Sequence, residues 1–159
     1  MAIPEFVKTL RAKIGQDPLP LVGVIAVVFD ERGRVLLVRR ADNRRWALVT
    51  GIIDPGEQPA AAAVREIEEE TAVTAEVERL LAIEARDLAT LMNGDQVWWT
   101  SIGFRCRHVS GEARVNDDES IDVGWFDLAT MPDLPPIQAR CLRLALADDA
   151  AAWFAQPTA

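Results

Sequence analysis

The sequence predicts an α/β fold in which a mixed central sheet carries helices on both faces. Two observations support it: apolar, β-branched segments of strand length alternate with amphipathic segments of helix length, and short turns join neighbouring strand segments. The 159 residues suit one domain, since domains typically contain about 100–150 residues. We therefore expect a single domain over residues 1–159, with residues 1–18 as an N-terminal helical extension and residues 136–159 as a C-terminal helix and tail.

Three segments have the spacing of apolar residues that is typical of helices. In the first, Phe6, Leu10 and Ile14 share one side of the predicted helix. In the second, Pro59 stands directly before the segment, where a first helical turn tolerates proline. The three predicted helices are Ile3–Ile14, Ala60–Thr71 and Pro136–Ala147.

Five segments are predicted to form strands. The first is an unbroken β-branched apolar run, which is typical of a strand buried on both faces. A turn at Glu31–Arg34 follows it, so the first two strands are expected to form a hairpin. The predicted strands are Leu21–Asp30, Val35–Arg39, Ala75–Arg86, Val97–His108 and Ile121–Phe126.

Composition excludes several classes of protein. A net charge of −8 argues against a nucleic-acid binder, which needs a broad basic face. The two cysteines are far apart, and one histidine cannot build a multi-histidine zinc site. The longest apolar run, Leu19–Phe29, is too short to span a membrane, and residues 1–15 lack the unbroken apolar segment of a secretory signal. We therefore expect a cytoplasmic protein whose chemistry depends on carboxylates, arginines and backbone groups.

The second predicted helix carries three glutamates on one side. Its buried stripe is predicted to be Ala60, Ala63, Val64 and Ile67. Glu66, Glu69 and Glu70 cluster beside that stripe, Glu68 points away, and Arg65 lies one turn before Glu69. Such carboxylates repel one another, and Mg²⁺ or Mn²⁺ would compensate the charge because both ions prefer oxygen ligands. The alternative is a solvated acidic face, which is the better interpretation of an arbitrary run of glutamates.

The residues before this helix favour the metal. The pattern Gly51-x5-Glu57-x7-Arg65-Glu66-Ile-x-Glu-Glu-x-Ala72-Val resembles the signature of the Nudix hydrolases, G-x5-E-x7-R-E-U-x-E-E-x-G-U, with U an aliphatic residue. The segment Trp46-Ala-Leu and the later D-D-E-S and W-F strings are similar to the family's flanking segments. The resemblance covers residues 21–128 and implies a Nudix α/β/α sandwich.

The resemblance also implies roles by motif position. It makes Glu66, Glu69 and Glu70 the metal-binding carboxylates, with Glu66 alternatively the base that deprotonates water. Arg65 would orient these glutamates, and Glu57 would support the loop or bind metal through water. The remaining metal ligand would be a backbone carbonyl, of Thr50 or Gly51.

Residues outside the motif supply further candidates. Glu119, in the D-D-E-S string, could act as a base from a loop beside the metal, or could simply cap the next element. Trp98 or Trp99 could stack on a nucleobase, and Trp98 is our candidate; the other tryptophan would belong to the core. Four arginines near the motif could bind phosphates, the alternative being solvated charge: Arg39, Arg40, Arg44 and Arg45.

The function implied by the resemblance is Mg²⁺- or Mn²⁺-dependent hydrolysis of a pyrophosphate linkage in a nucleoside diphosphate derivative. The alternative is a catalytically silent Nudix-like module that senses a nucleotide or binds a partner. We expect a small nucleotide as substrate, a nucleoside triphosphate or a nucleotide-sugar or ADP-ribose-like compound. No nucleic-acid polymer or membrane is expected as a partner, while a homodimer is compatible with the sequence.

Two residues depart from the family pattern. Thr50 stands where the usual L-P-G-G lead-in has its first glycine, and Ala72 replaces the last glycine of the signature. If either glycine supplies a positive φ, the residue here would be strained or the loop would be reshaped.

Overall fold

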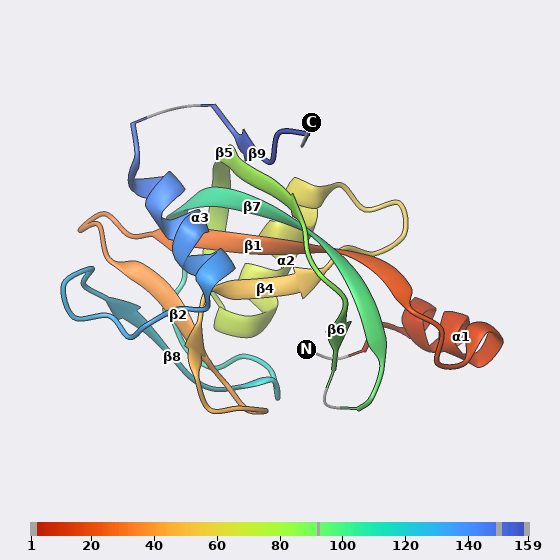
Figure 1. The fold of residues 1–159 in the computed structure, drawn as a ribbon. Helices are drawn as coiled ribbons and strands as arrows, with labels where there is room; N and C mark the ends of the chain where they lie inside the picture. The colour runs from red at the N-terminus through yellow and green to blue at the C-terminus, as the bar shows by residue number, and fades with distance from the viewer. Residues whose placement is uncertain (1–2, 92, 149–150, 158–159) are drawn as a thin grey trace.

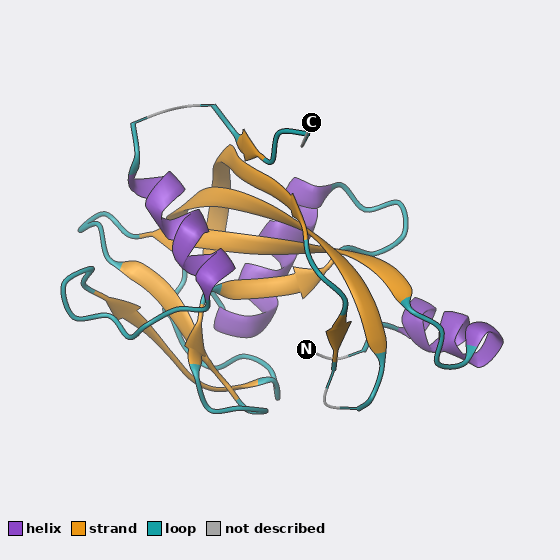
Figure 2. Ribbon diagram, in the orientation of Figure 1, coloured by secondary structure: helices purple, strands orange, loops and turns teal. Residues whose placement is uncertain are grey.

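The computed structural model describes residues 3–91, 93–148 and 151–157. Figure 1 shows the path of the chain, and Figure 2 separates its helices from its strands. The helices are α1 (Glu5–Ile14), α2 (Pro59–Thr71) and α3 (Pro136–Leu146). The strands are β1 (Leu19–Phe29), β2 (Val35–Arg40), β3 (Trp46–Ala47), β4 (Val49–Ile52), β5 (Thr74–Ala85), β6 (Ala89–Thr90), β7 (Gln96–Ser110), β8 (Ser120–Phe126) and β9 (Trp153–Phe154).

All strands join one mixed sheet with β1 near its centre. The order is β3-β2-β1-β7-β5-β9, while β4 pairs with β1, β6 with β7 and β8 with β2. β1 runs parallel to β7 along its whole length and antiparallel to β4. The predicted hairpin is confirmed at its turn, where Phe29 pairs with Val35. Beyond that pair, β2 turns away to β3 and β8, and β4 pairs with β1 instead.

Helices cover both faces of the sheet, as the sequence predicts. α2 packs on one face with Val24 and Phe104, and α3 packs on the opposite face with Ile25 and Leu81 (Figure 2). Successive residues of β1 contribute to opposite cores because side chains of a strand alternate between faces. The prediction that β1 is buried on both faces is confirmed from Gly23 onward.

The N-terminal extension forms helix α1, which begins two residues later than predicted. It packs against the end of the sheet through Val7, which is buried with Leu21 and Val97. The predicted apolar side is therefore partly wrong: Val7 is its buried residue, whereas Leu10 is exposed. Residues 1–2 of the predicted extension, and 149–150 and 158–159 of the predicted tail, lie outside the described residues. None of the described helices is long and apolar enough to cross a membrane.

The buried side of α2 also differs from the predicted stripe. Ala60 is exposed, while Ala62, Ala63, Ile67 and Glu70 are buried. The stripe is thus rotated toward the glutamates. Glu70 belongs to the face that packs on the sheet, rather than to a separate cluster beside it, and this places an ionisable group against the core.

Candidate active site

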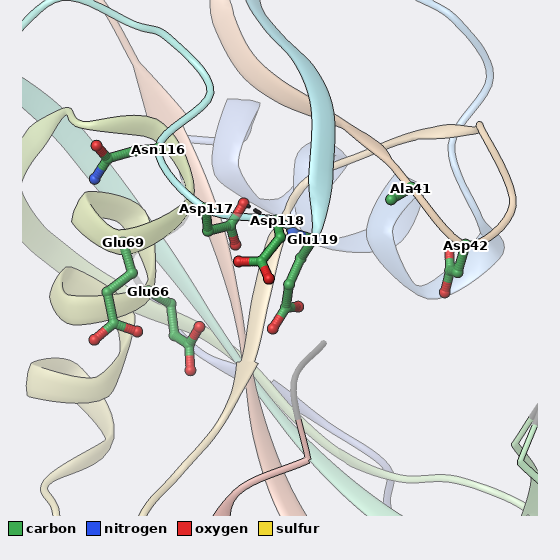
Figure 3. A pocket seen from close by; sticks show the side chains of 8 residues that line it. All are labelled: Ala41, Asp42, Glu66, Glu69, Asn116, Asp117, Asp118 and Glu119. Atoms are coloured by element: carbon green, nitrogen blue, oxygen red, sulfur yellow. Dashed lines mark hydrogen bonds between the residues drawn. The ribbon is translucent and has the colours of Figure 1, made fainter.

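An acidic cavity of about 780 Å³ lies between α2 and the loop before β8. Figure 3 shows its lining: two glutamates come from α2, the loop supplies a run of polar residues, and the turn between β2 and β3 completes the wall. The lining residues are Ala41, Asp42, Glu66, Glu69, Asn116, Asp117, Asp118 and Glu119. Six of these eight are carboxylates, so the cavity would repel a phosphate unless cations were bound.

Gly51 allows α2 to approach β4 closely. A Cβ added at Gly51 would overlap the carboxyl end of the Glu66 side chain, which lies against this backbone. No side chain larger than hydrogen fits there without displacing Glu66. The glycine that begins the motif therefore fixes the position of Glu66.

Thr50 presents its carbonyl to the open side of β4. Gly51 pairs with Val24 in the antiparallel register, and the Ile53 N–H donates to the Val22 carbonyl. Since hydrogen-bonded pairs alternate along an antiparallel ladder, Gly51 bonds to β1 while the Thr50 carbonyl points away from it. Thr50 is not in the positive-φ region, so its side chain causes no backbone strain.

Arg65 connects the motif loop to α2. Its Nε and Nη2 donate to the two oxygens of Glu57, each at 2.9 Å, and Nη2 also donates to the Ile52 carbonyl. Nη1 donates to Glu66 Oε1 at 2.9 Å and to Glu69 Oε2 at 3.1 Å. Hydrogen bonds from the guanidinium hold the pKa of Glu57 below its ordinary value. The predicted partnership of Arg65 with Glu69 is therefore present, together with three further partners.

Burial disfavours the ionised forms of two glutamates of α2. Glu70 is 5% exposed, and its pKa is raised to about 9 by desolvation and by the charges of Glu66, Asp117 and Glu119. Desolvation also raises the pKa of Glu66 to about 7, although Arg65 opposes that shift. A cation placed among these groups would favour their ionised forms.

The residues fit a hard divalent cation by their chemistry. Carboxylate oxygens and a backbone carbonyl are the ligands that Mg²⁺ and Mn²⁺ prefer, and a cation would offset the cost of ionising the buried Glu70. Within the described parts of the chain, no three side chains of the His, Cys, Asp or Glu type are already placed to hold an ion. Glu66 and Glu69 each give one oxygen to Arg65, so the second oxygen of each carboxylate lies outside these ion pairs and can be offered to a cation.

The loop before β8 supplies residues that the sequence analysis did not select. Asn116 ties it to the end of α2, because its N–H and side-chain amide donate to the carbonyls of Glu70 and Glu68. Asp117 Oδ1 accepts hydrogen bonds from the N–H groups of Glu119 and Ser120. The capping role considered for Glu119 thus belongs to Asp117. A residue that accepts from N–H groups two positions on is a known turn signal, and it could have identified Asp117.

The four predicted phosphate-binding arginines differ in their partners and in their position relative to the acidic cavity. Arg40 forms a two-point ion pair with Asp42 and acts electrostatically on Glu70 and Glu119. Arg39 donates to the Arg44 carbonyl. Arg44 and Arg45 are exposed on the turn after β2, and neither lines the acidic cavity.

The two adjacent tryptophans also differ. Trp98, the predicted stacking residue, is 48% exposed and lines none of the cavities described. Trp99 is partly buried and lines a second cavity. Trp99 is therefore better placed than Trp98 to contact a ligand.

A model of the NUDIX domain matches residues 19–145. The chain belongs to the Nudix family. A MutT-like protein of Streptomyces ambofaciens is 34% identical to this Nudix chain over 109 residues, covering 69% of this chain and 65% of that protein. A putative 8-oxo-dGTP diphosphatase of Bacillus subtilis is 30% identical over 110 residues, covering 69% and 68%.

Solved structures agree with this membership. A MutT NUDIX hydrolase from Burkholderia pseudomallei is 31% identical with a TM-score of 0.65, covering 79% of this chain and 97% of that one. The observed mixed sheet between α2 and α3 is thus the Nudix α/β/α sandwich that the motif implied. The chain spans about two thirds of the two curated relatives.

Ala72 shows the cost of one departure from the Nudix signature. It ends α2 in the left-handed conformation, with φ 57° and ψ 19°, and its N–H donates to the Glu68 carbonyl. This conformation favours glycine because a Cβ crowds the backbone there. Ala72 is therefore strained, as predicted, whereas Thr50 is not.

Proposed function

We propose that this Nudix domain hydrolyses a pyrophosphate linkage in a nucleoside diphosphate derivative, with Mg²⁺ or Mn²⁺ bound at the acidic cavity. The observation that carries the proposal is the buried carboxylate of Glu70, with Glu66 beside it and the cavity acids in front. A buried carboxyl group contributes little to a structural core, whereas a bound cation would stabilise its ionised form, which supports a cation site here. The Nudix hydrolases to which the chain is similar support the same activity.

The proposed cation ligands are Glu66, Glu69, Glu70 and the Thr50 carbonyl, with Glu57 acting through water. The Gly51 carbonyl, also predicted as a ligand, is engaged in the β4–β1 ladder and is the weaker candidate. A bound divalent cation neutralises phosphate charge and lowers the pKa of a water ligand. Arg65 is proposed as a positioning residue, because it bonds Glu57, Glu66 and Glu69 at once.

The proposed chemical step is attack of a water oxygen on phosphorus, with cleavage of the bond to the bridging oxygen and transfer of the water proton to a carboxylate. Glu66 is the proposed proton acceptor because it lines the cavity and is held against Gly51. Glu119 is the alternative acceptor, from the opposite wall (Figure 3).

The proposed substrate is a nucleoside triphosphate or a nucleotide-sugar or ADP-ribose-like diphosphate. The name of the Bacillus subtilis relative, a putative 8-oxo-dGTP diphosphatase, supports the first class. We propose that the partner is a small nucleotide rather than a nucleic-acid polymer or a membrane, and that the protein acts in the cytoplasm. A homodimer stays a prediction, which sedimentation velocity would test.

The decisive experiment is phosphate or pyrophosphate release from a panel of nucleoside triphosphates, nucleotide sugars, ADP-ribose and a short RNA, with Mg²⁺, with Mn²⁺ and with chelator. We expect hydrolysis of a small nucleotide that stops with chelator. Glu69→Gln should abolish it, whereas Glu68→Gln, on the exposed side of the same helix, should not. Cation and nucleotide binding without turnover would instead establish the silent module.

A further inference from the structure

A second cavity of about 460 Å³ adjoins the acidic one at the turn between β2 and β3. Asp42 lines both cavities. Arg40 lines the second cavity, and its charge acts on Glu70 and Glu119 of the first site. A molecule whose phosphates lie in the acidic cavity can therefore extend past Arg40 into the second.

The second cavity has a different lining from the first. Leu21, Ile52, Val97 and Trp99 from the sheet form an apolar wall. Its volume lies in the usual range of small-molecule sites, which are mainly apolar with a few polar groups. The apolar wall suits a flat ring that stacks on an indole, and polar side chains on the remaining wall, among them Asn43, Thr90 and Asn93, supply hydrogen-bonding groups for the edges of such a ring.

Helix α1 closes this cavity from outside the Nudix domain. The family match begins at residue 19, whereas Ile3, Val7 and Arg11 of the preceding segment line the cavity. Thr90 of β6 lines the same cavity as Ile3, so the segment before α1 and the end of β6 both contribute to its wall. The cavity thus depends on a helix that is not part of the matched family domain.

Arg11 fixes α1 against the hairpin of β6 and β7. Its Nη2 donates to the Gln96 carbonyl at 2.8 Å, and its Nε lies 3.3 Å from Asp95 Oδ1 with both side chains 13% exposed. Its Nη1 donates to the carbonyls of Gly15 and Asp17, which follow the last residue of the helix. One guanidinium therefore joins the helix, its C-terminal turn and the far wall of the cavity.

We propose that α1 is a specificity element of this Nudix domain: it closes the second cavity around the nucleobase of the substrate, which stacks on Trp99, and Arg11 is the positioning residue that holds it there. The proposal rests on the proposed function for its choice of a nucleotide. It goes beyond that function by assigning base recognition partly to a helix outside the family domain.

Calorimetric titration with the four nucleoside monophosphates, and with ribose 5-phosphate as the base-free control, tests the proposal without any hydrolysis. We expect at least one nucleotide to bind about tenfold or more tightly than ribose 5-phosphate, since stacking of one base contributes about 1–3 kcal/mol. Trp99→Leu should remove that difference, while Trp98→Leu, the matched control on the neighbouring exposed residue, should retain it. Equal binding of nucleotides and ribose 5-phosphate, or no binding at all, would overturn the proposal.

The role of α1 is tested with Arg11→Ala, Arg11→Lys and Lys13→Ala in the full chain. Arg11→Ala should weaken nucleotide binding about tenfold and leave ribose 5-phosphate unchanged, Arg11→Lys should restore part of the difference, and Lys13→Ala should match the unaltered protein. Loss of thermal stability without loss of base preference would overturn a specificity role for α1. If the protein hydrolyses no nucleotide yet binds bases in this pattern, the proposed function fails and the base site stands.

Discussion

The two helices that cover the sheet have similar lengths, but α2 buries a carboxyl group whereas α3 buries the uncharged residues Gln138, Cys141 and Ala145. α3 buries Cys141 and Ala145 against the sheet, and strand arginines satisfy its last carbonyls: Arg79 donates to Leu144 and Ala147, and Arg105 donates to Ala145. α2 instead buries Glu70 in its packed face. The buried residues of α3 need no ligand, whereas ionisation of Glu70 in α2 costs free energy in the apo protein because its carboxyl group is desolvated.

The largest expected difference between the helices is their contribution to the pH dependence of the free energy of unfolding. In metal-free protein, we expect the free energy of unfolding to fall as pH rises from 5 to 8. The pKa values of Glu70 and Glu66 in the folded state, about 9 and about 7, lie above the ordinary 4.5. The folded state therefore binds more protons than the unfolded state in this window, and stability present near pH 4.5 is lost as pH rises, by up to about 1.4 kcal/mol per pH unit and group.

Urea unfolding with chelator at several pH values measures this slope. Glu70→Gln should flatten it, Glu68→Gln should leave it unchanged, and added Mg²⁺ should stabilise the protein more at pH 8 than at pH 5. Carboxylates with lowered pKa, such as Glu57 and Asp30, contribute stability that disappears only at more acidic pH. A stability that increases between pH 5 and pH 8 would contradict the assignment of buried charge to α2.

The next largest expected effect is a loss of activity when Arg65 of α2 is replaced by lysine. Arg65→Lys should lower kcat by about 100-fold, because an ammonium group cannot bond Glu57, Glu66 and Glu69 in the planar arrangement of the guanidinium. Arg140→Lys is the matched change in α3, where Arg140 bonds Glu84 and lies over Trp153. Steady-state kinetics should find the second variant nearly unchanged, and equal losses in both would show that Arg65 merely stabilises the fold.

Removing a contact between β7 and α3 is expected to lower stability without changing activity. Arg105→Met removes the bond to the Ala145 carbonyl and the ion pair with Glu78. We expect the free energy of unfolding to fall by about 1.5–3 kcal/mol, the usual contribution of a hydrogen bond to a charged group. Activity per folded molecule should be retained. A large fall in kcat with unaltered stability would remove the contrast between the two helices.

The smallest expected effect is a gain in stability from a substitution at the end of α2. Ala72→Gly should raise the free energy of unfolding by about 1 kcal/mol, because glycine adopts the left-handed conformation of residue 72 without the Cβ penalty. Ala147→Gly is the comparison at the end of α3, where φ is −75°, and it should bring no gain. Thermal unfolding of both variants measures the difference.

The sequence predicts the fold well where periodicity is strong and poorly where alanines obscure it. The main strands and all three helices follow from apolar spacing, within a few residues. The predicted buried side of α2 is confirmed at Ala63 and Ile67 and wrong at Ala60. The alanines at 60–63 offer no contrast between faces, so a helical wheel does not show that Glu70 is buried. The short strands β3, β6 and β9 have two residues each, and their partners rather than their own sequences define them.

The residues of the candidate site likewise fall into those that a local pattern predicts and those that it does not. Gly51, Glu57, Arg65 and the glutamates lie within one local motif, so their spacing along the chain is enough to identify them. Asn116 reaches Glu68 across 48 positions, and no local pattern reports such a contact. Alternation could separate Trp98 from Trp99, yet it could not show that α1 would enclose one of them.

The parallel pairing of β1 with β7 has a consequence during synthesis. Leu19 to Phe29 pair with Val97 to Arg107. The apolar strand β1 therefore lacks its β7 partner until more than half of the polypeptide has been synthesised. Until then, the nascent chain exposes an apolar strand with an unpaired edge. Such edges bind chaperones and promote aggregation. Ribosome stalling between these two strands should therefore yield products that precipitate, whereas stalling soon after β7 should not.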